Sequence, residues 1–462
     1  MARDFDVIVI GGGGAGLAAA ITAARAGASV LVVEADAKLG GTSALSTGVV
    51  YAAGTSVQKR AGVSDDPADM LNYAMTLNAY RAQPHLLRQM AYDSASVVEW
   101  LISLGVTFDP ADLYISGVDT VARGHRAKDN GIEIMNALDQ AASLSGVTVS
   151  LQTRVRRLRQ REDGAVTGIV VDGETVTAEA VVLATGGFGA NTEMLARHYP
   201  DAAASESLWY VGSPFARGDG IALGQAAGAE LGGFNSGVLQ ITPGLVRELE
   251  SYLPGWLIFV NRDGRRFIRE TGAYGVMAGV LADQVGGEAF AVFDEAARRA
   301  AKVIVTYKPL APNWTADQLE VFIREGRITQ AGSLDDLAEK IGVRASTLAT
   351  TVENYNRDCC LGVDSLFFKD PSYLKPIATA PFYACRLRPG IVGYTAAGLR
   401  IDTGAQVLDA SDRPIAGLYA AGETTCVLPA RYLGGGASLT NNFVFGRIAG
   451  ENAAHRAARE TT

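Results

Sequence analysis

Residues 5–34 read FDVIVIGGGGAGLAAAITAARAGASVLVVE, and this stretch decides the fold. Residues 7–10 are all β-branched, as expected of a strand that is buried on both faces. Residues 17–26 are rich in alanine, which favours a helix, and residues 30–33 form a second short apolar run. The pattern predicts a strand, a glycine turn, a helix and a second strand.

Gly11, Gly13 and Gly16 fall on the G-x-G-x-x-G spacing between the first strand and the helix. The first glycine permits the tight turn, the second lets a pyrophosphate approach the backbone, and the third lets the helix pack on the strand. The helix N-terminus directs partial positive charge at the phosphates. Glu34 follows the second strand at the spacing of an acid that accepts hydrogen bonds from an adenosine ribose. We therefore predict that this unit binds a dinucleotide.

The composition limits what the whole chain can be. Its 462 residues are enough for two domains, or for one large domain with an insertion. The net charge of -8 and the pI near 5.2 argue against a nucleic acid as the main partner. No apolar run approaches the ~20 residues of a membrane span, and the first strand begins too early to leave room for a signal peptide. The four cysteines form no C-x-x-C pair and there are only four histidines, so we expect no metal site, no disulfide framework and a cytoplasmic location.

Residues 38–48 read KLGGTSALSTG. This loop resembles the GG[TS]S loop of the flavoproteins of the fumarate reductase/succinate dehydrogenase family, which lies along the pyrophosphate and the flavin of FAD. The resemblance implies that Gly40, Gly41, Thr42 and Ser43 contact FAD. Members that bind flavin covalently have a histidine in this loop. Because this chain has none there, we expect FAD to be bound non-covalently.

The middle of the chain predicts further helices and a small sheet. Residues 66–105 have apolar positions at helical spacing and predict two helices, and residues 131–145 predict another. Residues 109–126 are irregular. A strand over residues 147–151 leads into hairpin turns with β-branched flanks over residues 163–177. A small sheet at this point is usual in FAD enzymes of the Rossmann type.

Three more motifs of the family follow in order. Residues 181–187 read VVLATGG, a buried strand that ends in the second FAD signature of this class. Residues 217–221 read RGDGI where the family has T-G-D-G, which implies that Asp219 lies near the ribityl chain. Residues 259–270 read FVNRDGRRFIRE and match the family's VNxxGxRFxxE, which we interpret as strand, turn and strand. Val155 stands where the family places a backbone contact to adenine.

Two closing motifs complete the resemblance. Residues 415–423 read IAGLYAAGE, and residues 433–450 read LGGGASLTNNFVFGRIAG, a glycine turn that enters a long helix. The resemblance implies that Glu423 binds a ribityl or ribose hydroxyl. It also implies that the N–H groups around Ser438 and Leu439 meet the pyrimidine edge of the flavin, where a helix N-terminus favours negative charge.

The motifs together predict an α/β fold. A Rossmann-type FAD-binding domain is expected over residues 1–231 and 376–462, with an inserted α+β substrate-capping domain over residues 232–375. The predicted cofactor-binding residues are Gly11, Gly13, Gly14, Ala15, Gly16, Glu34, Ala35, Gly40, Gly41, Thr42, Ser43, Val155, Ala184, Thr185, Gly186, Asp219, Gly422, Glu423, Ser438 and Leu439.

Family membership alone does not fix the reaction, so we compared the substrate positions of the family's dicarboxylate reductases. Those enzymes use an arginine just after RFxxE as the proton donor, and here the matching residue is Tyr274. A second arginine binds substrate carboxylate before the L-G-G turn, where this chain has Tyr432, with Arg431 one residue earlier. A histidine before the family's T-x-G-G is replaced by Tyr394. Three charged groups have become three phenols, so fumarate and succinate are poor candidates for the substrate.

Residues 432–436, YLGGG, resemble instead the Y-x-G-x-G of 3-ketosteroid Δ1-dehydrogenases. In those enzymes the tyrosine hydroxyl and the N–H of the last glycine bind the substrate ketone, and a tyrosine of the capping domain removes the α-proton. The resemblance implies that Tyr432 and Gly436 bind a ketone and that Tyr274 is the base. Tyr114, in the irregular stretch, is a candidate for a helper phenol.

The chemistry explains why these residue types are needed. A C–H next to a ketone is a weak acid, and two hydrogen-bond donors on the carbonyl oxygen stabilise the enolate as an oxyanion hole does. The base takes the α-proton while the β-hydrogen leaves as hydride to flavin N5. Since a tyrosine with a pKa of ~10 is a poor base at pH 7, it needs a nearby cation or second phenol. Arg266, Arg269 and Arg431 are candidates for the cation.

We therefore expect an FAD-dependent dehydrogenase that introduces a C=C next to the carbonyl of a cyclic ketone. Steroid dehydrogenases of this family are usually longer, which favours a small ring ketone such as 4-oxocyclohexanecarboxylate, whose carboxylate Arg431 would suit, although a 3-ketosteroid stays open. Two alternatives are a flavin ene-reductase running in the reverse direction and a flavin-binding redox protein without turnover. The electron acceptor is open between oxygen, a quinone and a carrier protein. The sequence has no C-x-x-C-H haem motif and no iron–sulfur cysteine cluster.

Overall fold

The computed structural model describes residues 3–206, 208–245, 253–302 and 314–459. The chain divides into two compact units. Unit 1 comprises residues 1–203, 212–238 and 393–462, and unit 2 comprises residues 204–211 and 239–392. These limits differ from the predicted boundaries chiefly at residues 376–392, which belong to unit 2 and of which residues 382–392 form part of a strand of its sheet.

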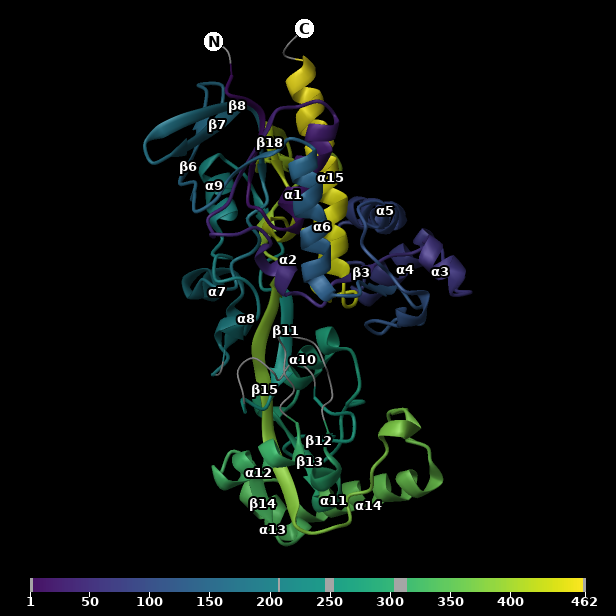
Figure 1. Ribbon diagram of the computed structural model, residues 1–462. Helices are drawn as coiled ribbons and strands as arrows, with labels where there is room; N and C mark the ends of the chain where they lie inside the picture. The colour runs from purple at the N-terminus through teal and green to yellow at the C-terminus, as the bar shows by residue number, and fades with distance from the viewer. Residues whose placement is uncertain (1–2, 207, 246–252, 303–313, 460–462) are drawn as a thin grey trace. The chain divides into compact units, whose positions relative to one another are not determined.

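A mainly parallel sheet forms the centre of unit 1 (Figure 1). Its strands run in the order β17-β18-β8-β1-β2-β5, and every neighbouring pair is parallel except β17 with β18. β7 and β6 extend it as an antiparallel hairpin on β8. The strands are β1 (Phe5–Ile10), β2 (Val30–Val33), β5 (Thr148–Ser150), β6 (Arg157–Gln160), β7 (Val166–Val171), β8 (Glu174–Leu183), β17 (Gln406–Leu408) and β18 (Pro414–Ala420).

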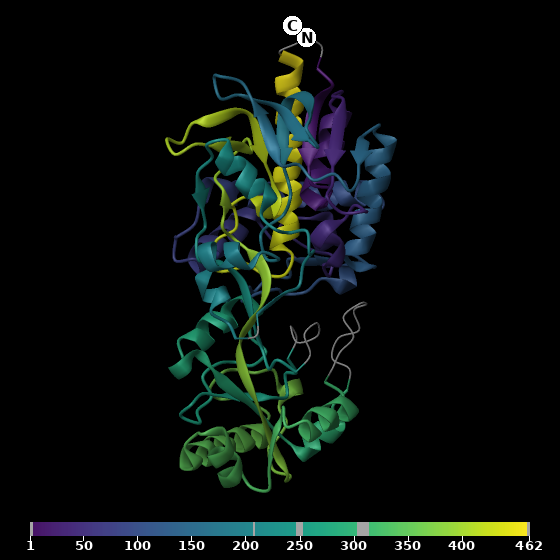
Figure 2. The same ribbon diagram turned by 90° about the vertical axis from the view of Figure 1, so that its left-hand side faces the viewer.

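Two helices from opposite ends of the chain pack together in unit 1. α1 (Gly14–Arg25) and α15 (Ala437–Arg459) lie side by side in both Figure 1 and Figure 2. A Cβ at Gly446 or Gly450 would lie 2.5 or 2.1 Å from a backbone oxygen of α1, so only glycine permits this approach. The contact joins the N-terminal and C-terminal parts of the chain into one domain, as predicted.

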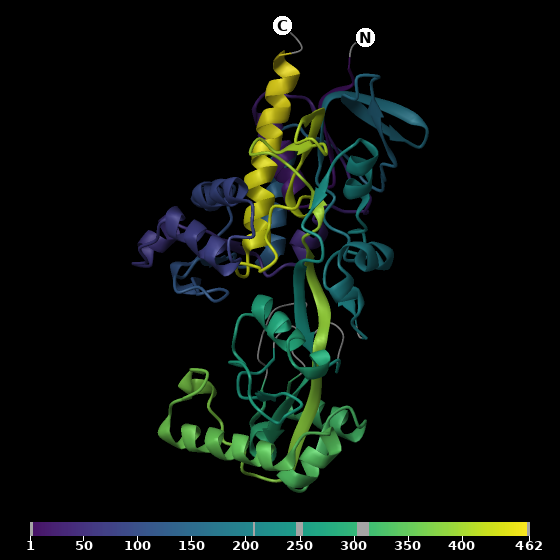
Figure 3. The same cartoon turned by 180° about the vertical axis from the view of Figure 1, so that it is seen from behind.

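The remaining helices of unit 1 surround this centre. Figure 3 shows α5 beside the long α15, and α4 packs against α5. The helices are α2 (Gly41–Leu45), α3 (Ser56–Arg60), α4 (Pro67–Leu77), α5 (Pro84–Ser103), α6 (Asn130–Leu144), α7 (Thr192–His198), α8 (Pro200–Ala203) and α9 (Asp219–Ala226). Two short ladders complete unit 1: β3 (Val49–Tyr51) pairs with β4 (Gly124–Arg126), and β10 (Leu231–Gly232) pairs with β16 (Gly398–Leu399). The helices predicted over residues 66–105 and 131–145 are confirmed, whereas the predicted loop at residues 41–45 is a short helix.

Unit 2 contains a second sheet with helices on both faces. Its strands are β9 (Trp209–Tyr210), β11 (Gly237–Thr242), β12 (Ile258–Val260), β13 (Ala289–Asp294), β14 (Thr329–Ala331) and β15 (Phe382–Thr395), of which β11 and β15 continue into unit 1. Its helices are α10 (Tyr274–Ala282), α11 (Glu295–Ala300), α12 (Ala316–Arg324), α13 (Leu334–Ile341) and α14 (Ala345–Leu361).

Alternate residues of the unit 2 sheet enter two separate cores. Ile258 and Val260 pack in the same cluster as α13 and α14, whereas Phe259 packs in the cluster of α10 and α12. This is the period of two that a strand imposes on its side chains. The predicted strand–turn–strand over residues 259–270 is wrong in its second half, because the return segment makes a single bridge between Val260 and Arg266 and no second strand.

The described units together confirm the predicted α/β fold with a Rossmann-type domain. None of the helices in the described ranges is long and apolar enough to cross a membrane.

Candidate active site

A pocket lies in unit 1 at the carboxyl ends of the parallel strands, with about 800 Å³ of empty space that is partly open to solvent. Ligands of open α/β sheets bind at this edge. Fifteen of the predicted cofactor-binding residues line it: Gly11, Gly13, Gly14, Ala15, Glu34, Ala35, Gly41, Thr42, Ser43, Val155, Ala184, Thr185, Gly186, Asp219 and Glu423. They come from all parts of the predicted FAD-binding domain, so the fold brings together motifs that are far apart in the sequence.

The glycines of the pocket divide into two kinds. A Cβ at Gly11 would lie 2.4 Å from the carbonyl oxygen of Ala184, so this glycine serves close packing within the protein. In contrast, a Cβ at Gly13, Gly41 or Gly186 would meet no atom closer than 3.7 Å. These three glycines face open space in the pocket. They leave bare backbone there, which a pyrophosphate can approach.

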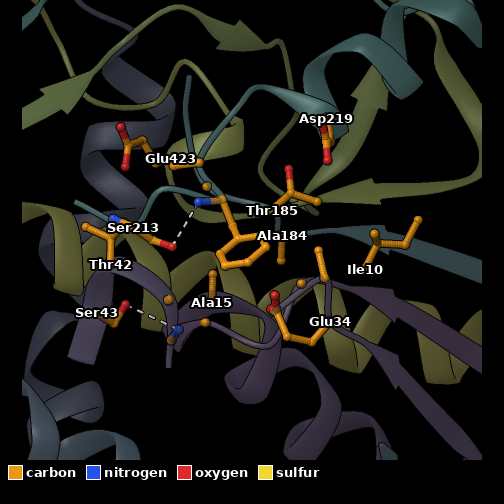
Figure 4. Close-up of a pocket in the computed structure, with 18 of the residues that line it drawn as sticks. Ile10, Ala15, Glu34, Thr42, Ser43, Ala184, Thr185, Ser213, Asp219 and Glu423 are labelled. Atoms are coloured by element: carbon orange, nitrogen blue, oxygen red, sulfur yellow. Dashed lines mark hydrogen bonds between the residues drawn. The ribbon is translucent and has the colours of Figure 1, made fainter. Parts of the chain in front are cut away.

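Glu34 is held in place by its own surroundings. One carboxylate oxygen accepts from the N–H of Gly12 at 2.6 Å and the other from the N–H of Asp36 at 2.8 Å. The side chain is buried but lines the pocket. Figure 4 shows Glu34 and Glu423 on opposite sides of the pocket. A ligand with hydroxyl groups near both ends would therefore find a carboxylate at each.

The short helix α2 lines the pocket through its hydroxyl groups. Ser43 Oγ accepts from the N–H of Gly14 at 3.2 Å, and Thr42 Oγ1 accepts from the N–H of Ser213 at 3.1 Å (Figure 4). Asn442 Nδ2 of α15 also donates to Ser43 Oγ, at 3.4 Å. These bonds tie the helix to three other segments of unit 1 and fix the two hydroxyls at the pocket wall.

Asp219 stands at the first position of α9 and forms an ion pair across the pocket wall. Arg154 Nη2 lies 2.5 Å from Asp219 Oδ1, and both residues line the pocket. Arg154 was not predicted, although it directly precedes Val155. The pair places a cation and an anion together where the sequence indicated the aspartate alone.

Glu423 is buried at the other side of the pocket and accepts hydrogen bonds from its neighbours. Its Oε1 accepts from both the N–H and the hydroxyl of Thr395, each at 2.8 Å. Burial raises the pKa of Glu423 to about 7, although these two hydrogen bonds and one from the N–H of Gly187 oppose the rise. The carboxyl group therefore exchanges its proton near neutral pH in the protein without a ligand.

Five predicted cofactor-binding residues do not line this pocket: Gly16, Gly40, Gly422, Ser438 and Leu439. Gly16 packs on the backbone of Gly11, as its predicted role in helix packing requires. The N–H of Ser438, which was predicted to meet the flavin, donates instead to the hydroxyl oxygen of Tyr432 at 2.9 Å.

Sequence reasoning missed nine residues that line the pocket: Ile10, Val33, Thr153, Arg154, Ser213, Phe215, Ala216, Ala421 and Asn442. Most are neighbours of motif residues, and adjacency was the available signal. Ser213, Phe215 and Ala216 belong to a segment with no recognisable motif, and they reach the pocket only through the tertiary fold.

Three of the predicted tyrosines gather in a second part of unit 1, which we call the phenol cluster: Tyr114, Tyr394 and Tyr432. The rings of Tyr394 and Tyr432 have centroids 6.1 Å apart. Tyr114 is near enough to Tyr432 to raise its pKa electrostatically, and the guanidinium of Arg126 lies 5.2 Å from the centre of the Tyr114 ring. Sequence reasoning had not noticed Arg126.

Burial dominates the chemistry of the phenol cluster. It raises the pKa of Tyr432 to about 12 and that of Tyr394 well above its ordinary value. Both hydroxyls therefore keep their protons at neutral pH and can donate them to a ligand. Because the oxygen of Tyr432 accepts from the N–H of Ser438, its own proton is directed elsewhere.

Gly436 supplies a second donor beside Tyr432. Its carbonyl accepts from the N–H of Thr440 at 3.0 Å, while its own N–H has no acceptor within the described part of the chain. Gly436 adopts φ +103°, and a Cβ there would lie 2.8 Å from two backbone atoms of β3, so the position requires glycine. The turn thus presents a hydroxyl and an N–H from residues four apart.

The two remaining predicted site residues lie elsewhere. Tyr274 belongs to unit 2, where it is the first residue of α10 and is partly exposed. Arg431 is exposed, and its Nη1 donates to the carbonyl of Leu77 at the end of α4, at 3.4 Å. The predicted roles of Tyr274 as a base and of Arg431 as a carboxylate ligand stay predictions.

Arg266, considered as a cation for the base, is occupied in unit 2. It forms ion pairs with Glu270 at 2.8 Å and with Asp364 at 2.9 Å, and all three side chains are buried. Lys369 lies 2.8 Å from the same Glu270. Two cations and two anions thus balance one another, which argues against a catalytic charge at Arg266.

The pocket fits FAD on the evidence of its own residues. Bare backbone at three glycines suits a pyrophosphate, and a carboxylate on either side suits ribose and ribityl hydroxyls.

Comparisons with known proteins agree with this geometry. A family model described as an FAD binding domain matches residues 6–439. A probable fumarate reductase of Shewanella frigidimarina is 34% identical over 466 residues, covering 98% of this chain and 75% of the relative. The 4-oxocyclohexanecarboxylate 2-dehydrogenase of Sinomonas cyclohexanicum is 30% identical over 556 residues, covering 98% of this chain and 93% of the relative. Among solved structures, the 3-ketosteroid-Δ4-(5α)-dehydrogenase of Rhodococcus jostii, in complex with 4-androstene-3,17-dione, has a TM-score of 0.80 and 29% identity, covering 98% of each chain.

Proposed function

The chain belongs to the family of FAD-binding oxidoreductases that includes the fumarate reductases, and we propose that it introduces a C=C bond next to the carbonyl of a cyclic ketone. FAD is the cofactor of this family, and relatives of this chain act on small molecules. Cyclic-ketone desaturation is the finer step that we add.

The pair of donors at Tyr432 and Gly436 carries this proposal. A ketone oxygen placed between the Tyr432 hydroxyl and the Gly436 N–H receives two hydrogen bonds, which stabilise the negative charge of an enolate. The raised pKa of Tyr432, about 12, keeps the hydroxyl protonated, so that it can donate throughout the physiological range. A dicarboxylate would instead require cations, and the three predicted substrate positions have phenols in place of the family's charged residues.

Tyr274 is our candidate for the base that removes the α-proton. It stands at the first position of α10, where the helix N-terminus favours the negative charge that a tyrosine base carries. When bound, FAD supplies the two-electron acceptor for the hydrogen at the β-carbon. The protein's own contribution is to hold the ketone, polarise it and take the proton. In this proposal unit 2 is the substrate-capping domain.

The substrate that we favour is a small ring ketone. Two relatives support a ring ketone in general: one is named for 4-oxocyclohexanecarboxylate, and the structure of the other holds a steroid dione. Arg431 would suit a carboxylate on the ring. We further propose non-covalent FAD, since none of the chain's four histidines lines the pocket.

A specific observation favours a second function. Several relatives over nearly the whole chain are named as reductases, including a probable fumarate reductase at 34% identity and a urocanate reductase of Eggerthella lenta at 31%. The same residues would then serve an ene-reductase, with Tyr274 as the proton donor. A flavin-binding protein without turnover is the third possibility.

Anaerobic flavin absorbance separates these functions. The purified holoprotein is mixed with cyclohexanone, 4-oxocyclohexanecarboxylate and a 3-ketosteroid in turn. Bleaching of the oxidised flavin by one of them is the expected result and identifies the substrate class. If none bleaches it and the chemically reduced protein is reoxidised by an enone or by fumarate, the protein is a reductase. No reaction in either direction contradicts both enzymatic proposals.

A further inference from the structure

The turn that carries the donor pair is held by side chains from a distant helix. Asn78, the C-cap residue directly after α4, is buried and clasps the backbone of Arg431 by bonding both its N–H and its carbonyl. Its Oδ1 accepts from the N–H of Arg431 at 2.8 Å, and its Nδ2 donates to the carbonyl of the same residue at 3.1 Å. These two hydrogen bonds resemble the pair that two antiparallel strand residues exchange, and they fix the residue directly before Tyr432.

A second side chain of α4 fixes the residue directly after Tyr432. The hydroxyl of Tyr73 donates to the carbonyl of Leu433 at 2.6 Å. Burial raises the pKa of Tyr73 to about 12, so it keeps the proton that this bond needs. Ser116 Oγ then donates to the carbonyl of Gly435 at 3.4 Å. Carbonyls at residues 431, 433 and 435 are thus each taken by a side chain from outside the turn.

The helix that provides two of these contacts is itself firmly anchored. Asp66 caps α4 by accepting from the N–H of Ala68 at 2.7 Å, and Pro67 occupies the first helical position. Asp65, just before the cap, forms an ion pair at 2.7 Å with the buried Arg123. Because these contacts hold α4 in place, the hydrogen bonds from Tyr73 and Asn78 define where residues 431–435 lie.

We infer that Asn78 and Tyr73 are positioning residues that hold Tyr432 and Gly436 in place as the carbonyl-binding pair. The inference deepens the proposed function and rests on it for its catalytic consequence, but the clamp itself is a property of unit 1. Neither side chain needs to touch the substrate, since both act through the backbone on either side of Tyr432.

The first test measures the clamp without any substrate. Hydrogen exchange of the holoprotein is followed by mass spectrometry for Asn78→Ala and Tyr73→Phe. Peptides covering residues 431–436 should exchange at least ~10-fold faster in both variants, while peptides from the middle of α15 stay unchanged. Asn72→Ala and Tyr80→Phe are the matched controls, because both side chains are exposed near the same helix. Unchanged exchange at residues 431–436 would overturn the inference.

The second test asks whether Asn78 acts through Tyr432. With whichever carbonyl substrate the wild type turns over, Asn78→Ala should lower kcat/KM by roughly 10- to 100-fold, as small misplacements of catalytic groups do. In a Tyr432→Phe background the same change should have a clearly smaller effect, because one of the two donors that Asn78 positions has gone. Asn78→Asp, which keeps the acceptor half of the clasp, should recover part of the loss. Full additivity of the two changes would contradict the inference.

The two tests separate this inference from the proposed function. If the wild type turns over no carbonyl compound, the proposed function fails while hydrogen exchange still decides whether the clamp exists. If turnover occurs and neither exchange nor the double-variant cycle shows coupling, the proposed function stands and the clamp fails.

Discussion

Two buried polar clusters in this molecule differ in how completely their hydrogen-bonding groups are satisfied. In unit 2, two cations and two anions, Arg266, Lys369, Glu270 and Asp364, form an ion-pair network in which each side chain has at least one partner of opposite charge. In the phenol cluster of unit 1, the hydroxyl of Tyr394 and the amide of the fully buried Asn441 make no hydrogen bond of normal geometry within the described residues, although the amide lies near enough to oppose the raised pKa of the phenol.

The difference indicates different purposes. Buried polar groups in native proteins are normally paired, and a completed network specifies structure. Arg266 holds the pKa of Asp364 down to about 2 although burial opposes this, so Asp364 stays charged at neutral pH. A cluster with unfilled hydrogen-bonding capacity is instead found where a ligand or water completes it. We therefore expect the ion-pair network to stabilise unit 2 and the phenol cluster to bind a ligand.

The largest expected effect follows from a change in the ion-pair network of unit 2. Replacing Arg266 with methionine leaves two buried carboxylates with Lys369 alone and should lower the free energy of unfolding of unit 2 by about 3–5 kcal/mol. Trp256 and Trp314 lie in the core of unit 2, so their fluorescence in a urea titration reports on it. The neighbouring exposed Arg265→Met should have little effect. Equal losses from the two variants would show that the network is not what stabilises this unit.

The next effect is catalytic and concerns Tyr432. Tyr432→Phe removes one of two carbonyl donors and should lower kcat for the ketone by ~10²–10³, the usual cost of one oxyanion-hole donor. Flavin content and thermal stability should stay close to those of the wild type. Tyr419→Phe, which removes another buried hydroxyl of unit 1, serves as the control. A loss of flavin that parallels the loss of activity would move Tyr432 from the reaction to cofactor binding.

A smaller effect depends on pH and concerns Glu423, which borders both the pocket and the phenol cluster. Its pKa is raised from 4.5 to about 7 in the folded protein without ligand. A carboxyl group whose folded pKa is raised stabilises the fold below its unfolded pKa, and this contribution is lost as pH rises through 7. From pH 5 to pH 8 the flavin-free wild type should therefore lose about 2–3 kcal/mol of stability relative to Glu423→Gln. Urea titrations at the two pH values measure this, and parallel pH profiles would refute it.

The sequence predicted the cofactor pocket much better than the surroundings of the substrate residues. Gly13, Gly16 and Glu34 act through backbone geometry within one βαβ unit, so local spacing determines their environment. The partners of Arg266 and Arg431 are set by contacts across 98 and 354 residues, between Arg266 and Asp364 and between Arg431 and Leu77. No local pattern shows that Arg266 is neutralised by Asp364 or that Asn78 clasps the turn before Tyr432.

The smallest expected effect concerns Tyr394, and it sharpens the comparison most. Since its hydroxyl makes no hydrogen bond of normal geometry within the described residues and only the Asn441 amide lies near it, Tyr394→Phe removes a desolvated polar group and breaks no strong hydrogen bond. The free energy of unfolding of the flavin-free protein should change by less than about 0.5 kcal/mol, or rise. Tyr383→Phe in unit 2 is the matched contrast, because that buried phenol donates to Glu295 at 2.7 Å and should cost about 1.5–3 kcal/mol, as bonds to charged groups do. A loss at Tyr394 as large as that at Tyr383 would mean that the hydroxyl is satisfied within the protein, by an enclosed water for example. The polar groups of the phenol cluster would then be fully paired, like those of the ion-pair network, and unfilled hydrogen-bonding capacity would no longer distinguish the two clusters.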